Sequence, residues 1–169
     1  LDVETGNLKF GVVTFIEARD VARLFANATG AVSLSFKAKA SSSIGNVKAV
    51  VLAWDGTADS PTSDVVSAWG ADGVTPTWAT NWTAENVPAN LSVTTSWASY
   101  SVLNIALDTA STKNLAVFVW NDDLTTTVGE FLRIADVQLE SGSVATAFEL
   151  QSYEESLAKL ALPDVDLAG

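Results

Sequence analysis

Three residue types are missing from this sequence of 169 residues, which has no cysteine, no histidine and no methionine. Without cysteine there are no disulfides, thiol nucleophiles or zinc–thiolate centres, and without histidine a Ser–His–Asp triad is excluded as well. Because an initiator methionine is absent, we expect that Leu1 is a processed or internal boundary of a longer chain. Most familiar catalytic arrangements are excluded, and we expect no enzyme activity.

Charge is also scarce and is mostly of one sign. Only 17% of the residues are charged, and 20 acidic against 9 basic residues give a net charge of −11 at pH 7. Phosphate backbones and anionic lipids repel such a chain, so we expect no nucleic-acid binding. No apolar run approaches the roughly 20 residues of a membrane-spanning helix, so we expect no membrane insertion. The low charge fraction fits a subunit that buries an additional face against neighbours.

Segments typical of β-strands recur along the chain, each rich in β-branched or aromatic residues. They cover residues 8–15, 31–38, 47–54, 99–107, 114–120 and 131–139. In the second segment Val32, Leu34 and Phe36 alternate with polar residues, which predicts a strand with one face in water. Residues 115–120 are apolar throughout, which predicts a central strand whose outer face is covered by a second layer or by a partner subunit.

The stretch from residue 55 to residue 97 carries three prolines and many Ser and Thr residues. A structureless stretch of this length is uncommon in a compact domain, so it holds either weak strands or a functional loop. Strand candidates at 74–79 and 91–95 bring the count to about eight, the number of a jelly roll with two packed sheets. A further short strand is expected at 146–149.

Helical signals are few. Residues 17–25 place Val21, Leu24 and Phe25 at helical spacing before an Asn-Ala-Thr-Gly breaker, which predicts a short helical turn. We therefore expect an all-β fold, a jelly-roll β-sandwich of about eight antiparallel strands, over residues 1–150. Residues 151–169 are expected to form a short capped C-terminal helix followed by an extended arm.

One segment resembles a known group of proteins. Residues 134–149 read IADVQLESGSVATAFE, which is similar to the closing motif of phage and prophage structural proteins, roughly VQLE-x-G-S-x-A-T-x-F-E. Residues 51–66 are similar to an internal segment of that group, and residues 32–37 to its VTLSF strand. The resemblance implies a jelly roll like that of carbohydrate-binding modules, carried on tail fibres, head fibres or capsid decoration proteins. The chain departs from the group after residue 159, where a Tyr-rich helix gives way to Leu-Ala-Leu-Pro.

Tryptophan gathers in and beside the long Pro-containing stretch. Five of the six tryptophans lie there, namely Trp54, Trp69, Trp78, Trp82 and Trp97. Exposed indoles could stack on sugar rings, whereas buried ones would pin the loops to the sandwich or to a neighbouring subunit. We favour the second reading and keep the first as an alternative.

Two groups of carboxylates are candidates for calcium. Asp55, Asp59, Asp64 and Asp72 share the long stretch, but their spacing does not match an EF-hand loop. The resemblance to carbohydrate-binding jelly rolls implies a second candidate, a structural calcium between Glu17 and Asp136. The competing reading of Asp136 is that it pairs with Arg19 or Arg23 or caps loop amides.

The function expected from these observations is that of a virion structural protein on the surface of a phage particle, with a mechanical and adhesive role. We expect it to pack as a homotrimer beside other virion proteins, with residues 160–169 latched onto an adjacent subunit, and to adhere to host glycans. The alternative is a monomeric carbohydrate-binding module that binds glycan through loop tryptophans. A glycan-cleaving enzyme would need a carboxylate pair across a cleft, and no pair stands out.

Overall fold

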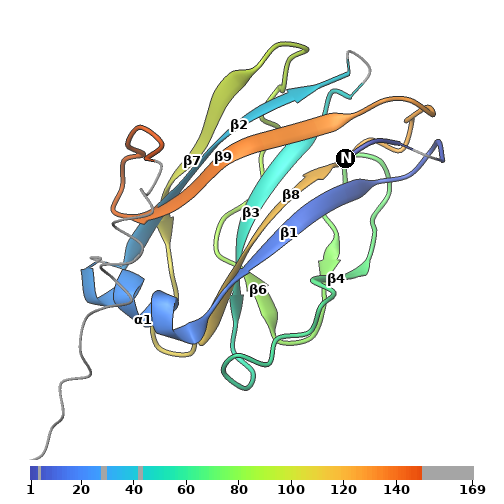
Figure 1. Ribbon diagram of the computed structural model, residues 1–169. Coiled ribbons are helices and arrows are strands. Elements are labelled where there is room, and N and C mark those ends of the chain that lie inside the picture. The colour runs from blue at the N-terminus through green and yellow to red at the C-terminus, as the bar shows by residue number, and fades with distance from the viewer. Residues whose placement is uncertain (4, 28–29, 42–43, 150–169) are drawn as a thin grey trace, which may run out of the picture.

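The computed structural model describes residues 1–3, 5–27, 30–41 and 44–149, and within them the chain forms an antiparallel β-sandwich with one short helix (Figure 1). The elements are β1 (Phe10–Ile16), α1 (Ala18–Asn27), β2 (Ala31–Ala40), β3 (Val47–Trp54), β4 (Val66–Ala68), β5 (Thr77–Trp78), β6 (Trp82–Ala84), β7 (Ala98–Ala106), β8 (Asn114–Asn121) and β9 (Leu132–Ser141). All six main strand segments expected from the sequence form strands, and the helical turn forms α1. The helix and arm expected at 151–169 lie outside the described residues.

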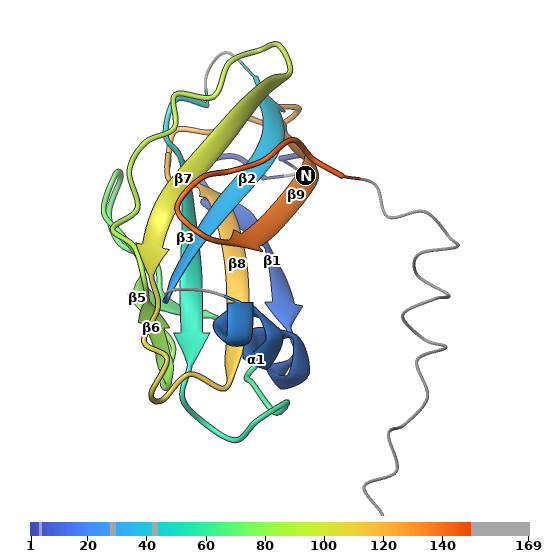
Figure 2. The ribbon, with the colours of Figure 1, turned by 90° about the vertical axis from the view of Figure 1, so that its left-hand side faces the viewer.

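Two sheets make the sandwich. One has the strand order β1-β8-β3-β6, the other has the order β7-β2-β9, and β4 and β5 pair as a small separate hairpin. The long strands alternate between the layers, with β1, β3 and β8 in the first sheet and β2, β7 and β9 in the second (Figures 1 and 2). No helix in the described part of the chain is long and apolar enough to span a bilayer.

The main core lies between the two sheets. As the alternation predicts, Val32, Leu34 and Phe36 of β2 are buried there, against inward residues of β3, β8 and β9. Ser33 is the exception on the polar side of β2, because it is fully buried. Its hydroxyl donates to the carbonyl of Gly142 at 2.9 Å and accepts from the amide of Asn104 at 3.3 Å, so burial leaves no unmet hydrogen bond.

A second core covers the outer face of β8. Trp54 of β3 and Phe118 and Trp120 of β8 pack there with Val65 and Trp82, which come from the segment between β3 and β7. The Phe118 and Trp120 rings stack with centroids 5.1 Å apart, and Trp78 of β5 meets both edge-on. The cover expected over this apolar strand is therefore supplied by the chain's own long segment, and a partner subunit is not needed for it.

Two of the weaker strand predictions are wrong. Residues 91–95 are irregular because Ser92 has a φ of 50°, outside extended backbone, and the segment is held by single bonds such as the Leu91 amide to the Val47 carbonyl. Residues 146–149 are also irregular, because the Thr146 amide binds the carboxylate of Glu140 rather than a strand neighbour. At 74–79 only the two residues of β5 form a strand.

Candidate functional site

The outer face of the β7-β2-β9 sheet is the best candidate site. Successive side chains of a strand point to opposite faces, so Ser35, Lys37 and Lys39 point outward while Leu34 and Phe36 enter the core. The register places Ser99 opposite Lys37 and Ser101 opposite Ser35 on β7. The face is thus a row of hydroxyl and ammonium groups on three hydrogen-bonded strands.

Two adjoining hollows follow this face. The larger, about 670 Å³, has Ser35, Lys37, Ser99 and Ser101 along its floor and residues 145–148 as a wall. The smaller, about 480 Å³, lies beside Trp97 and shares Lys37, Ser99 and Asp136 with the first. We call the two together the outer-face groove. The groove combines polar groups on a rigid sheet with an exposed aromatic side chain. Binding sites for small ligands commonly have such a combination.

A β-bulge positions the only ion pair of this groove within the described residues. Ser35 faces Gln138 and Lys37 faces Ala135, so two residues of β9 stand opposite Phe36. The first of them, Asp136, has a φ of 52°, a left-handed conformation that Asp tolerates better than most residues. Its carboxylate meets the Lys37 ammonium at 2.8 Å. The bulge therefore turns a carboxylate toward the groove.

The wall of the groove is the strap, which we define as residues 142–149. It folds back across the outer face of β2 and is seen in orange-red in Figure 2. The Glu140 carboxylate accepts from the Thr146 amide at 2.6 Å and from its hydroxyl at 2.8 Å, and Gln138 accepts from the Glu149 amide at 3.2 Å. Burial opposes ionisation of Glu140, but these bonds and one from Gln138 hold its pKa below the ordinary value. The anchoring thus depends on an ionised carboxylate.

The strap should loosen in acid. A carboxyl whose pKa is lowered in the folded state stabilises at pH values above its ordinary pKa, and the contribution is lost as the pH falls through the lowered value. We expect the exchange protection of the Thr146 amide to disappear over that acidic range, and Glu140→Gln to remove it at neutral pH. Hydrogen exchange followed by NMR measures both.

Glu149→Gln is the matched control, because the Glu149 carboxylate makes no hydrogen bond or ion pair within the described residues. It should leave the Thr146 amide protected. Equal protection in Glu140→Gln and Glu149→Gln at pH 7 would show that Glu140 does not anchor the strap.

The structure divides the five tryptophans in and beside the long segment into two groups. Trp54 and Trp82 are buried with their ring centroids 5.1 Å apart, and Trp78 is partly buried against β8, so these three pin the segment to the sheet. Trp69 and Trp97 keep 43% and 48% of their surface exposed. Trp69 packs against Phe118 of the second core, whereas Trp97 lines the outer-face groove.

The structure does not bring Glu17 and Asp136 together as ligands of one ion, because Asp136 has a protein partner instead. Asp136 pairs with Lys37 and not with Arg19 or Arg23, both of which approach Asp20. At Glu17 the backbone carbonyl accepts from the amides of Asp20 and Val21 in the first turn of α1. Among the residues that the structure describes, no group of three or more acidic side chains lies close enough to hold a metal ion.

The aspartates of the long segment anchor loops. Asp59 accepts from the Ala18 amide at 2.7 Å and from the Asn114 side chain at 2.8 Å, and these bonds lower its pKa. Asp72 accepts from the Leu124 amide at 2.7 Å. Asp55 and Asp64 are exposed, and we attach no role to them.

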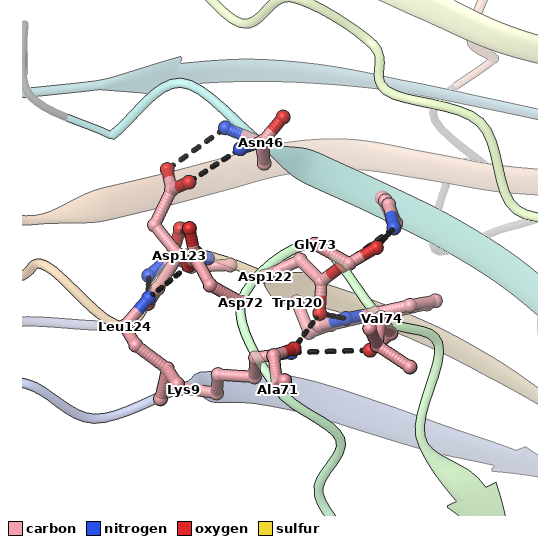
Figure 3. A network of polar contacts seen from close by, with 12 residues as sticks. Lys9, Asn46, Ala71, Asp72, Gly73, Val74, Trp120, Asp122, Asp123 and Leu124 are labelled. Atoms are coloured by element: carbon pink, nitrogen blue, oxygen red, sulfur yellow. Dashed lines mark hydrogen bonds and ion pairs between the residues drawn. The ribbon is translucent and has the colours of Figure 1, made fainter.

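Sequence reasoning missed a buried charge cluster at one end of the sandwich (Figure 3). The ammonium groups of Lys9 and Lys48 meet the two oxygens of Asp122 at 2.6 and 2.5 Å. Lys9 also donates to the carbonyls of Ala71 and Val74, and Lys48 to that of Gly73. Trp120 donates its indole N–H to Asp122 at 3.2 Å.

Every donor of Lys9 is used by these contacts, since an ammonium has three, and no buried side-chain polar atom of the described residues lacks a partner. Lys48 uses two of its three donors and is nearly buried, and through the backbone carbonyls of residues 71–74 the cluster clamps this segment to the sheet. The signal in the sequence was a lysine inside an apolar strand, Lys48 in VKAVVLAW, because a buried lysine requires a partner.

No known protein family, no curated protein and no solved structure matches this chain. The likeness of residues 134–149 to phage structural proteins therefore stays a prediction from the sequence, and the function has to be argued from the site.

Proposed function

We propose that this protein is a non-catalytic module on the surface of a phage particle, which binds glycans through the outer-face groove. The observation that carries the proposal is the pairing of an exposed indole, Trp97, with a floor of hydroxyl groups and the Lys37–Asp136 pair. Sugars present an apolar C–H face that packs on indole and a rim of hydroxyls that exchange hydrogen bonds with such groups. Phe148, 38% exposed, is a second aromatic residue that lines the groove.

A glycan array probed with the labelled protein tests this function. We expect binding to a limited set of oligosaccharides, and about a tenfold weaker affinity in Trp97→Ala, since loss of an aromatic contact of about 1.4 kcal/mol is tenfold. Trp69→Ala is the matched control, because Trp69 is exposed to a similar extent but lies outside the groove. Binding that survives Trp97→Ala, or that Trp69→Ala weakens equally, would contradict this site.

The particle location is supported by the motif in residues 134–149, which in this structure supplies β9 and the strap. Antibodies raised against the chain should label assembled particles in electron micrographs. Label found only in particle-free fractions would count against a virion protein and favour the free carbohydrate-binding module.

Packing as a homotrimer is the second candidate function. It is favoured by an apolar groove of about 390 Å³ lined by α1, β1, β8 and β9, where Leu24, Val117 and Val137 are among the lining residues. Both β1 and β9 are edge strands, so another copy could extend the sandwich there and bury this groove. Light scattering tests this. A mass three times 17.7 kDa would support the homotrimer, and a monomer would contradict it without affecting the proposal of glycan binding.

A further inference from the structure

The groove's exposed indole stands next to a cluster of cations and rings. The Lys39 ammonium lies 5.3 Å from the centroid of the Trp97 ring and 5.9 Å from that of Phe131, and the Arg133 guanidinium lies 5.0 Å from the Phe131 ring. Lys39 and Arg133 are directly opposite in the β2–β9 register, and Trp97 immediately precedes β7. These four residues form what we call the basic–aromatic corner of the outer face.

Lys39 differs from the other cations of this face in its partners. Lys37 is paired with Asp136, and Arg133 meets Asp2 at 3.1 Å. Lys39 makes no ion pair or hydrogen bond to any residue that the structure describes, and its contacts are the faces of two aromatic rings. A cation–π contact at a partly exposed site contributes only about 0.5–1 kcal/mol. The two rings therefore hold the Lys39 ammonium in place, and no carboxylate of the described residues compensates its positive charge.

We propose that the basic–aromatic corner binds the carboxylate of an acidic sugar, a uronic or sialic acid. The sugar ring packs on Trp97 and its carboxylate pairs with Lys39, while Arg133 stays paired with Asp2. The hydroxyls of the same sugar reach Ser99 and the Lys37–Asp136 pair in the adjoining hollow. The inference rests on the proposed function and narrows its ligand from glycans in general to acidic glycans.

The net charge of −11 does not prevent this recognition. At physiological ionic strength the screening length is about 8 Å, so carboxylates elsewhere on the surface act weakly on a ligand at the corner. The nearby acidic groups, Asp2 and Asp136, are each paired with a cation. Neither of these two carboxylates therefore stands unpaired beside Lys39, and the carboxylate of Glu130, which precedes Phe131 in the chain, accepts from the Thr127 amide.

The test uses Lys39→Gln on an array that carries uronic- and sialic-acid oligosaccharides, their methyl esters and neutral oligosaccharides. Wild-type protein should prefer the acids over the matched esters by about tenfold or more, and salt should weaken the binding, because exposed charge pairs are screened. Lys39→Gln should abolish the preference, and Lys39→Arg should keep it. Lys113→Gln is the matched control, since Lys113 is exposed but lies next to β8 on the other sheet.

The outcomes separate the inference from the function on which it rests. Equal binding of acids and esters, or an acid preference that Lys39→Gln leaves intact, would overturn the inference while glycan binding stands. Binding to no oligosaccharide of any kind would overturn both. Thermal unfolding of each variant followed by circular dichroism should match the wild type, since none of the changed side chains is in either core.

Discussion

Replacing Asp122 by alanine should destabilise the protein by about 3–5 kcal/mol, the cost of removing one partner from a buried ion pair. Asp122 is fully buried, and it is the carboxylate that both buried lysines, Lys9 and Lys48, contact. Without it two ammonium groups remain in the interior with only backbone carbonyls as partners. Urea denaturation followed by Trp fluorescence measures the free energy of unfolding.

Two further variants serve as controls for the stability loss in Asp122→Ala. Asp20→Asn removes an exposed carboxylate with two basic neighbours and should cost less than about 1 kcal/mol, as surface ion pairs contribute little. Replacing Lys9, Lys48 and Asp122 together by Met, Met and Leu should recover much of the loss, because apolar residues of similar volume often replace a buried charge cluster without cost. An Asp122→Ala variant as stable as Asp20→Asn would show that the clamp does not contribute to stability.

Replacing Trp120 by alanine should cost about 3–5 kcal/mol, as large-to-small changes in a packed core do. Trp120 is completely buried, and its ring stacks on Phe118 and meets the edge of Trp78. The change leaves a cavity at the centre of the second core and removes a donor from Asp122. Because this core fastens the segment between β3 and β7, we also expect earlier proteolysis within residues 55–84 than in the rest of the chain.

Trp69→Ala is the matched control for Trp120→Ala. The centroids of the Trp69 and Phe118 rings lie 6.1 Å apart, and Trp69 keeps 43% of its surface exposed. Loss of the Trp69 side chain should therefore cost about 1 kcal/mol. Denaturation curves and limited proteolysis of the two variants measure the difference. Equal losses in both variants would mean that the second core is not packed as described.

Stability and binding are connected through the sheet. The clamp at Asp122 and the second core at Trp120 both hold the long segment against β8 and β3, on the layer opposite to the β7-β2-β9 sheet that carries the proposed binding face. A binding floor built on hydrogen-bonded strands is more rigid than one built on loops.

The candidate site was only partly readable from the sequence. The alternation in β2 placed Ser35 and Lys37 on a wet face, and Trp97 was among the tryptophans singled out for sugar binding. The partner of Asp136 was not readable, since Arg19 and Arg23 were expected and Lys37 was found. That pairing depends on a bulge in β9, and one residue more or less in the register changes which side chains meet.

The all-β class, the six main strands, α1 and the lack of histidine and cysteine chemistry can all be predicted from the amino-acid sequence. These follow from local periodicity and composition, which each segment carries within itself. The tertiary structure alone decided which strands are neighbours, that the chain's own tryptophans cover β8, and that Lys9 and Lys48 meet Asp122, 113 and 74 residues further along the chain. Such pairings depend on how distant segments pack, and no local pattern contains that information.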